Sequence, residues 1–237
     1  MPGGSAGAKS DIAKVVEKQM RNWELARAQR VPPQPDTPRP AVREFVTISR
    51  TLASGGSEVA TLLGEHLHWP VFDREILHAM AGDDRVRARL YERMDERDQS
   101  WLDDAARWLI KGELRRDDYF CRLTETMLAL ARQGPGIFLG RGADVILPRD
   151  HGLRVRITAP LDQRARAYGL QNNLPEHMAR AEVERVDRER TEFRRRHFGP
   201  SANDPERHDL ALNLERFTPP DAVELIVTAL RVRGLAR

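Results

Sequence analysis

The stretch TISRTLASGGSE, residues 47–58, decides the fold of this chain. β-Branched and apolar residues lead into it, and an apolar-periodic helix is predicted directly after it, over residues 59–67. A buried strand that passes through a small-residue turn into a helix forms a phosphate cradle, because backbone N–H groups converge there and the helix dipole favours an anion. The turn residues are therefore a candidate phosphate site: Ser54, Gly55, Gly56 and Ser57.

This turn lacks the lysine of the usual phosphate loop. That lysine reaches the β- and γ-phosphates, and a neighbouring hydroxyl ligates Mg²⁺. Here Gly56 is followed by Ser57 and Glu58. The chain has only four lysines, none near the turn in sequence: Lys9, Lys14, Lys18 and Lys111. If the turn handles a triphosphate, an arginine such as Arg50 has to replace the lysine.

Composition excludes several classes of function. The length of 237 residues suits one α/β domain with an appendage. Residues 1–40 carry the whole net charge of +3, so no broad nucleic-acid surface is expected on the rest of the chain. No apolar run approaches the roughly 18–20 residues of a membrane span, and the first residues have no signal-peptide core. Cys121 is the single cysteine, so we expect a cytoplasmic protein without intramolecular disulfides.

Residues 1–40 are predicted to be a separate N-terminal part, with the main domain over residues 41–237. Apolar residues recur at helical spacing over residues 11–30, and a proline-rich linker follows at residues 31–40. A tethered amphipathic helix must bury its apolar stripe, either on its own main domain or on a second copy of the chain. A homodimer through this helix is therefore an open alternative.

The main domain alternates predicted strands with helices. Strands are expected at residues 42–49, 71–73, 136–140, 153–159 and 209–213, and helices between them and at residues 222–232. This alternation predicts an α/β fold with a parallel sheet of roughly five strands and helices on both faces. Ligands of such folds bind at the carboxyl ends of the strands. The residues expected there are Arg50, Asp73, Arg74, Arg141 and Asn213.

Two arginine-containing segments could contact a ligand. Arg141 stands between two glycines directly after a predicted strand, so it would project into the crevice, or alternatively pair with a carboxylate such as Asp73 or Asp144. On the helix predicted over residues 175–197, Arg190 and Arg194 are four apart and share a face. This helix is either solvated and salt-bridged or a lid that closes over a phosphate. No metal ligands are identified.

These pieces, in this order, resemble the cytidylate kinase-like family of P-loop nucleoside monophosphate kinases, from about residue 43 to the C-terminus. The matching motifs are ISR (48–50), SGG (54–56), WPVFDREIL (69–77), LGRGA (139–143), RVRITAPL (154–161), DRER (187–190) and DLALN (209–213). The resemblance implies a three-layer P-loop kinase-like fold with a helical lid. It also implies phosphoryl transfer from ATP, with Mg²⁺, to a nucleoside monophosphate such as CMP or dCMP.

The resemblance also implies roles for individual residues. The donor phosphates would bind at Ser54, Gly55, Gly56 and Ser57, and the acceptor nucleotide at Asp73, Arg74 and Arg141. The implied catalytic residues are the lid arginines together with the arginine of the turn: Arg188, Arg190, Arg194 and Arg50. Nucleotides are the expected partners, and neither nucleic acid nor a membrane is expected as one.

The chain departs from the family pattern at three positions. The family turn usually has glycine where Ala53 stands and commonly a basic residue where Ser57 stands. True cytidylate kinases have aspartate after Gly-Arg, where this chain has Gly142. The alternative is therefore that the chain is a catalytically weak or inactive kinase-derived protein with a nucleotide-binding or regulatory function.

Overall fold

The computed structural model describes residues 5–28, 42–92, 94, 96–110 and 118–235. The described residues belong to two compact units, each considered by itself below. The first unit comprises Met1–Phe45, Leu67–Phe138 and Ile146–Gly152, and the second comprises Val46–His66, Leu139–Val145 and Leu153–Arg237. The predicted linker at residues 31–40 lies outside the described residues, and the predicted domain boundary after residue 40 stays a prediction.

A five-stranded parallel sheet in the order β2-β3-β1-β4-β5 confirms the α/β prediction. Its strands are β1 (Phe45–Arg50), β2 (Val71–Phe72), β3 (Gly136–Leu139), β4 (Gly152–Thr158) and β5 (Leu210–Asn213). In register, Val71 pairs with Ile137 and Val155 pairs with Leu210. Strands β1 and β3 are buried along almost their whole length, as in a parallel sheet that is covered on both faces.

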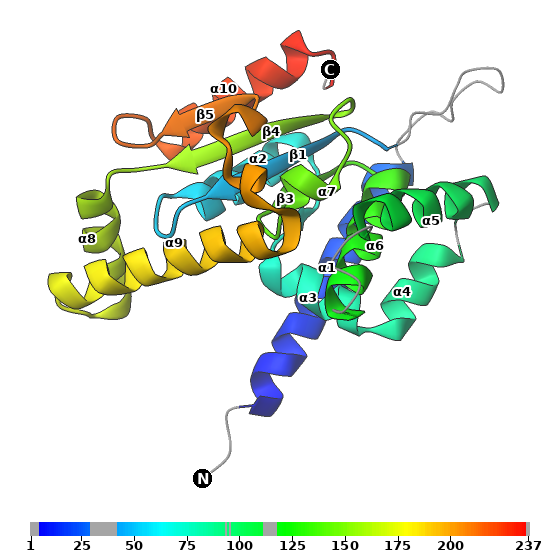
Figure 1. Ribbon diagram of the computed structural model, residues 1–237, viewed down its shortest axis with the longest axis horizontal. Coiled ribbons are helices and arrows are strands. Elements are labelled where there is room, and N and C mark those ends of the chain that lie inside the picture. The colour runs from blue at the N-terminus through cyan, green and yellow to red at the C-terminus, as the bar shows by residue number, and fades with distance from the viewer. Residues whose placement is uncertain (1–4, 29–41, 93, 95, 111–117, 236–237) are drawn as a thin grey trace. The chain divides into compact units, whose positions relative to one another are not determined.

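The first unit is mainly helical, with α1 (Ser5–Ala28), α3 (Arg74–Gly82), α4 (Asp84–Tyr91), α5 (Glu96–Ile110) and α6 (Asp118–Gln133) (Figure 1). Helix α1 buries Val16, Met20 and Trp23. The Trp23 indole Nε1 donates to the carbonyl of Leu130 in α6 at 3.3 Å. The helix thus buries part of its apolar stripe within its own chain, which is one of the two alternatives that the sequence left open, while Val15 and Leu25 are exposed. A homodimer through residues 11–30 stays a prediction.

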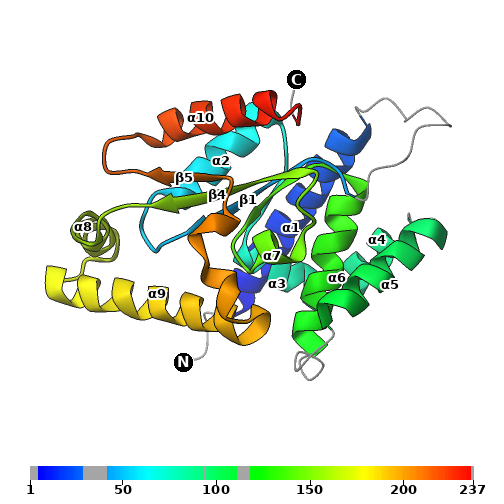
Figure 2. The same cartoon turned by 45° about the horizontal axis from the view of Figure 1, so that its top comes forward.

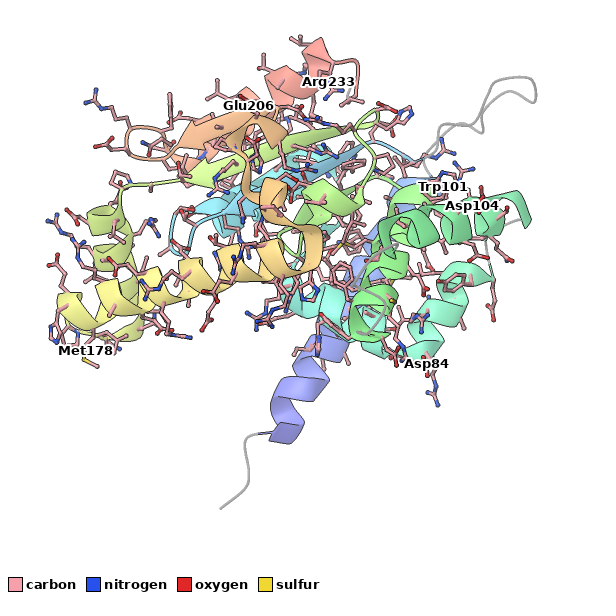
Figure 3. The ribbon with its side chains drawn as sticks, viewed as in Figure 1. Asp84, Trp101, Asp104, Met178, Glu206 and Arg233 are labelled. Carbon is pink, nitrogen blue, oxygen red and sulfur yellow. The ribbon has the colours of Figure 1, made fainter. Side chains whose placement is uncertain are left out.

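Paired acidic residues of the first unit are exposed to solvent. Asp83 caps α4 by accepting from the backbone N–H groups of Arg85 and Val86. Figure 3 shows Asp84 on α4 and Asp104 on α5, both exposed. Within the described ranges, no group of three or more His, Cys, Asp or Glu side chains could hold a metal ion. None of the described helices combines the length and the apolar character that crossing a membrane requires.

The second unit carries the phosphate turn and the predicted lid. Its helices are α2 (Gly56–Leu67), α7 (Ala143–Ile146), α8 (Leu161–Asn172), α9 (Glu176–Phe198), the 3-10 turns η2 (Pro200–Asn203) and η3 (Pro205–Arg207), and α10 (Pro219–Val232). Helices α2 and α10 lie on one side of strands β4 and β5, and α9 lies on the other (Figures 1 and 2). Helix α10 begins three residues before the expected Ala222, because Thr218 and Asp221 form a capping box.

Candidate active site

The phosphate turn is a strained connection that is pinned to strand β4. Ala53 and Gly55 both have positive φ, 57° and 80°, so alanine stands where glycine is the unstrained choice. The Ser54 hydroxyl donates to the carbonyls of Thr51 (3.0 Å) and Ile157 (3.4 Å). Helix α2 then begins at Gly56. Its first backbone N–H groups have no acceptor inside the helix, which leaves them available to an anion.

The Arg50 side chain crosses from the phosphate turn to the Gly140 turn. A Cβ on Gly56 would lie 2.8 Å from the Cβ of Arg50, and a Cβ on Gly140 would lie 2.5 Å from its Nη1. Both glycines therefore leave room for this arginine, the first for its stem and the second for its guanidinium. The cation at this turn is therefore an arginine that enters from the end of β1.

Helix α9 is tied to the turn by Asp187. One carboxylate oxygen of Asp187 accepts from the Leu52 backbone N–H at 2.8 Å, and the other accepts from Arg164 Nη1 at 2.6 Å. Arg164 also donates to the Leu52 carbonyl at 3.2 Å. One turn further along α9, Arg190 Nη1 donates to the Arg50 carbonyl at 3.1 Å. The predicted lid residue Arg190 and the turn residue Arg50 therefore lie together.

Asp144 and Arg194 form a buried, bidentate ion pair. Arg194 Nη1 and Nη2 donate to the two Asp144 oxygens at 2.6 and 2.7 Å, and the side chains are 1% and 12% exposed. Arg194 also donates to the Ala202 carbonyl and to Asn203 Oδ1. Burial alone would raise the pKa of Asp144, but the hydrogen bonds and charge of Arg194 lower it below its ordinary value. The pair anchors the C-terminal part of α9 to the start of α7.

Arg141 lies beside an aromatic ring of α9. Its backbone has a φ of 54°, and its guanidinium carbon lies 5.4 Å from the centre of the Phe193 ring. An arginine over an aromatic face is held by the ring's electrostatic quadrupole. The bidentate partner of Asp144 is Arg194, and the pairing of Arg141 with a carboxylate stays a prediction.

Two residues that the sequence analysis did not single out, Arg156 and His208, lie in the same environment. Burial lowers the pKa of Arg156, and so does the charge of Arg194, while Asp144 and Asp187 raise it. His208 Nε2 lies 4.0 Å from Asp144 Oδ2, and burial lowers the pKa of this imidazole. The available signal was the alternation of residues 153–157, where arginine alternates with apolar residues along β4.

The strand ends, α7, α8 and α9 thus bring together five arginines and two aspartates: Arg50, Arg156, Arg164, Arg190 and Arg194, with Asp144 and Asp187. An arginine guanidinium stays charged when it is partly buried and matches the geometry of a phosphate. This part of the second unit is therefore electrostatically suited to a polyphosphate.

The other predicted site residues are placed as follows. Ser57 and Glu58 are exposed in the first turn of α2. Arg188 is exposed and pairs with Glu184 at 3.8 Å, along the same helix. Asp73 caps α3 by accepting from the backbone N–H groups of Glu75 and Ile76, both at 2.9 Å.

The predicted acceptor residues are divided between the two units. Asp73 and Arg74, which is exposed at the start of α3, belong to the first unit, and Arg141 belongs to the second. The acceptor site that combines them stays a prediction. The cradle, Arg50, Arg190 and Arg194, by contrast, all belong to the second unit.

A parallel sheet of this strand order, with a glycine turn between β1 and α2, defines an α/β P-loop kinase-like protein. Residues 45–216 match the cytidylate kinase-like family, and the chain belongs to this family. Family and fold together place it among the nucleotide kinases.

Two relatives illustrate the similarity. A protein named cytidylate kinase from Halobacterium salinarum is 26% identical over 186 residues, which are 78% of this chain and 88% of that protein. The crystal structure of an uncharacterized protein from Eubacterium ventriosum superposes with a TM-score of 0.65 at 18% identity, covering 80% of this chain and 99% of that one. The second similarity supports the fold alone.

Proposed function

We propose that this protein transfers a phosphoryl group from ATP to a nucleoside monophosphate of the cytidylate class, with Arg50 in place of the phosphate-loop lysine. The observation that supports the proposal is the position of the Arg50 side chain, whose stem packs against Gly56 and whose guanidinium lies at Gly140. A cation is therefore present at the turn although the lysine is absent.

Phosphoryl transfer requires positioned cations more than a strong base. The transferring group spreads negative charge over its oxygens, and preorganised donors in a dry site stabilise that charge. Arg50 and Arg190 are joined by the hydrogen bond from Arg190 to the Arg50 carbonyl, so both cations sit at the turn. In this proposal, the N–H groups at the start of α2 hold the donor phosphates and the two arginines neutralise them.

The residues at the turn fit a magnesium–nucleotide complex. Mg²⁺ in kinases keeps several waters and is held largely by the substrate's phosphates. Ser57 is exposed in the first turn of α2, so its hydroxyl is the side-chain oxygen that could contribute there. The Ser54 hydroxyl is already committed to the carbonyls of Thr51 and Ile157. When bound, the metal would neutralise phosphate charge beside the two arginines.

The acceptor assignment rests on family membership and on the name of the Halobacterium relative. Asp73, Arg74 and Arg141 are the residues proposed to hold the acceptor. Arg141 already has its guanidinium over Phe193, which orients it on the α9 side of the Gly140 turn.

A coupled assay of ADP release tests this function, with ATP, Mg²⁺ and a panel of CMP, dCMP, UMP, AMP and GMP. We expect turnover to be highest with CMP or dCMP. Arg50→Met should lower kcat roughly 100- to 1,000-fold, the usual loss when one preorganised donor is removed. Arg185→Gln is the matched control, because Arg185 is an exposed α9 arginine whose ion pairs with described residues are to Glu182 and Glu189 of the same helix. Absence of turnover with every acceptor would overturn the proposal.

A second candidate function is nucleotide binding without transfer. The observation that favours it is the Asp187 carboxylate on the Leu52 N–H, since an anion of the protein already occupies one amide of the turn. Calorimetry with ATP and Mg²⁺ should then detect binding in a protein that shows no turnover, and Ser57→Lys should raise the affinity. If neither protein binds ATP, this candidate fails.

A further inference from the structure

Arg156 differs from its neighbouring arginines in its partners. Arg164 donates to Asp187, Arg190 to the Arg50 carbonyl, and Arg194 to Asp144. Among the residues that the structure describes, none forms a hydrogen bond or ion pair with the Arg156 guanidinium. Its interactions are longer-range attractions to Asp144 and Asp187 and a repulsion from Arg194.

The position of Arg156 on β4 is fixed by the two-residue period of a strand. Ile157, the next residue, directs its side chain to Gly56 at the start of α2, where a Cβ on Gly56 would lie 3.3 Å from the Ile157 Cβ. Successive side chains of a strand point to opposite faces. Arg156 therefore projects from the other face of β4, toward Asp144, Asp187 and Arg194.

The same short segment of β4 holds the phosphate turn. The Ile157 carbonyl accepts from the Thr51 backbone N–H at 3.3 Å and from the Ser54 hydroxyl at 3.4 Å. Arg156 is thus adjacent in sequence to the residue that pins the turn. The residue is half-buried, and the charge of Arg194 repels its guanidinium.

A half-buried cation without an acceptor is unfavourable for the folded protein. Desolvation of a charge costs free energy unless hydrogen bonds or an opposite charge compensate it. Charges that the protein leaves without a hydrogen-bonded partner occur preferentially at functional sites, where a ligand can supply one. Asp144 and Asp187 attract Arg156 through their charge, but their hydrogen bonds with arginine are to Arg194 and Arg164.

We propose that Arg156 is a phosphate-binding residue of this site, and that its guanidinium donates hydrogen bonds to oxygens of a phosphoryl group of the bound nucleotide. The planar guanidinium can donate two parallel hydrogen bonds to such a group. The inference rests on the proposed function and deepens it, because it adds a cation from β4 to those of the turn and of α9.

Calorimetric titrations with pyrophosphate, ATP and CMP, each with Mg²⁺, test the assignment in the full-length protein. The variants are Arg156→Gln, which removes the charge, and Arg156→Lys, which keeps the charge but lacks the planar guanidinium that donates two parallel hydrogen bonds. Arg185→Gln is the control for general loss of positive charge, since Arg185 is exposed on α9. We expect Arg156→Gln to weaken at least one of the three ligands roughly 10- to 100-fold, the usual loss of one charge-assisted hydrogen bond. Arg156→Lys should be intermediate and Arg185→Gln unchanged.

Thermal unfolding without ligand separates binding from a purely structural role. If Arg156 awaits a ligand, Arg156→Gln unfolds at the same or a higher temperature than the wild type, and the stabilisation by pyrophosphate or ATP is reduced. A midpoint lowered by about 5 °C or more, together with unchanged affinities for all three ligands, would overturn the proposal.

The same titrations distinguish this inference from the proposed function. Arg156-dependent anion binding in a protein without turnover overturns the transfer reaction and supports the inference. If the protein turns over but its affinities for the three ligands do not depend on Arg156, the transfer reaction is supported and the inference about Arg156 is overturned. A wild-type protein that binds none of the three ligands contradicts the inference outright.

Discussion

Replacing Asp144 tests whether the α9 anchor is held by charge. Asp144→Asn keeps the size of the side chain and removes the negative charge from a group that is 1% exposed. Arg194, 12% exposed, then keeps its charge without the carboxylate that accepts from both Nη1 and Nη2. Asn203 and the Ala202 carbonyl remain as neutral acceptors.

The expected cost follows from that geometry. Breaking a buried ion pair by removing one partner typically costs about 3–5 kcal/mol, because the remaining charge is buried and uncompensated. For a chain of this size each kcal/mol lowers the unfolding midpoint by about 2–4 °C, so we expect a loss on the order of 10 °C. The double variant Asp144→Leu with Arg194→Met should recover most of this loss, since apolar replacement of a buried pair is often neutral.

Urea unfolding followed by circular dichroism provides the measurement for the wild type, for Asp144→Asn, for the single variants Asp144→Leu and Arg194→Met, and for the double variant that combines these last two. A coupling free energy of several kcal/mol between the two positions is the expected result. A free energy of unfolding of Asp144→Asn that lies within about 1 kcal/mol of the wild-type value would refute the reasoning. So would a double variant that loses the sum of the two single losses.

Two further predictions concern pH and the N-terminal helix. Arg194 holds the pKa of folded Asp144 below the unfolded value of about 3.9, so the unfolded state binds more protons in that range. This stabilisation is present above about pH 4 and is lost as the pH falls further. The thermal unfolding midpoint of the wild type should therefore fall more steeply with acid than that of Asp144→Asn. Parallel plots of midpoint against pH for the two proteins would contradict this. Trp23→Ala should lower the free energy of unfolding by about 3–5 kcal/mol, because the ring is 1% exposed. The control Leu25→Ala, at a residue that is 55% exposed, should change the free energy of unfolding by no more than about 0.5 kcal/mol. Equal losses in the two variants would contradict the burial of Trp23 against α6.

The order of the strands and helices could be predicted from sequence because it depends on local patterns. The run of apolar residues in 45–48 predicts a buried strand, and the glycines at 55 and 56 predict the turn that follows. The charged sequence of residues 175–197 predicts a long helix, which is α9. Element ends moved by a few residues where a cap decided them, as at Thr218.

The partners of the charged residues could not be predicted, because they depend on which elements pack together. From sequence, Asp144 was one open alternative for Arg141, and only the folded chain gives it to Arg194, 50 residues away. Arg156 could not be distinguished from any other arginine of a strand, since only the folded chain shows that Asp144 and Asp187 form their ion pairs with Arg194 and Arg164.

The phosphate turn shows the same division. The amino-acid sequence alone predicts that a strand, a small-residue turn and a helix form a cradle, and it shows that no lysine stands in the turn. The folded chain adds that Arg50 fills the space over Gly56 and extends to Gly140, a residue 90 positions further along the chain. Backbone conformation follows from neighbouring residues, whereas the course of a long side chain follows from the surfaces that close around it.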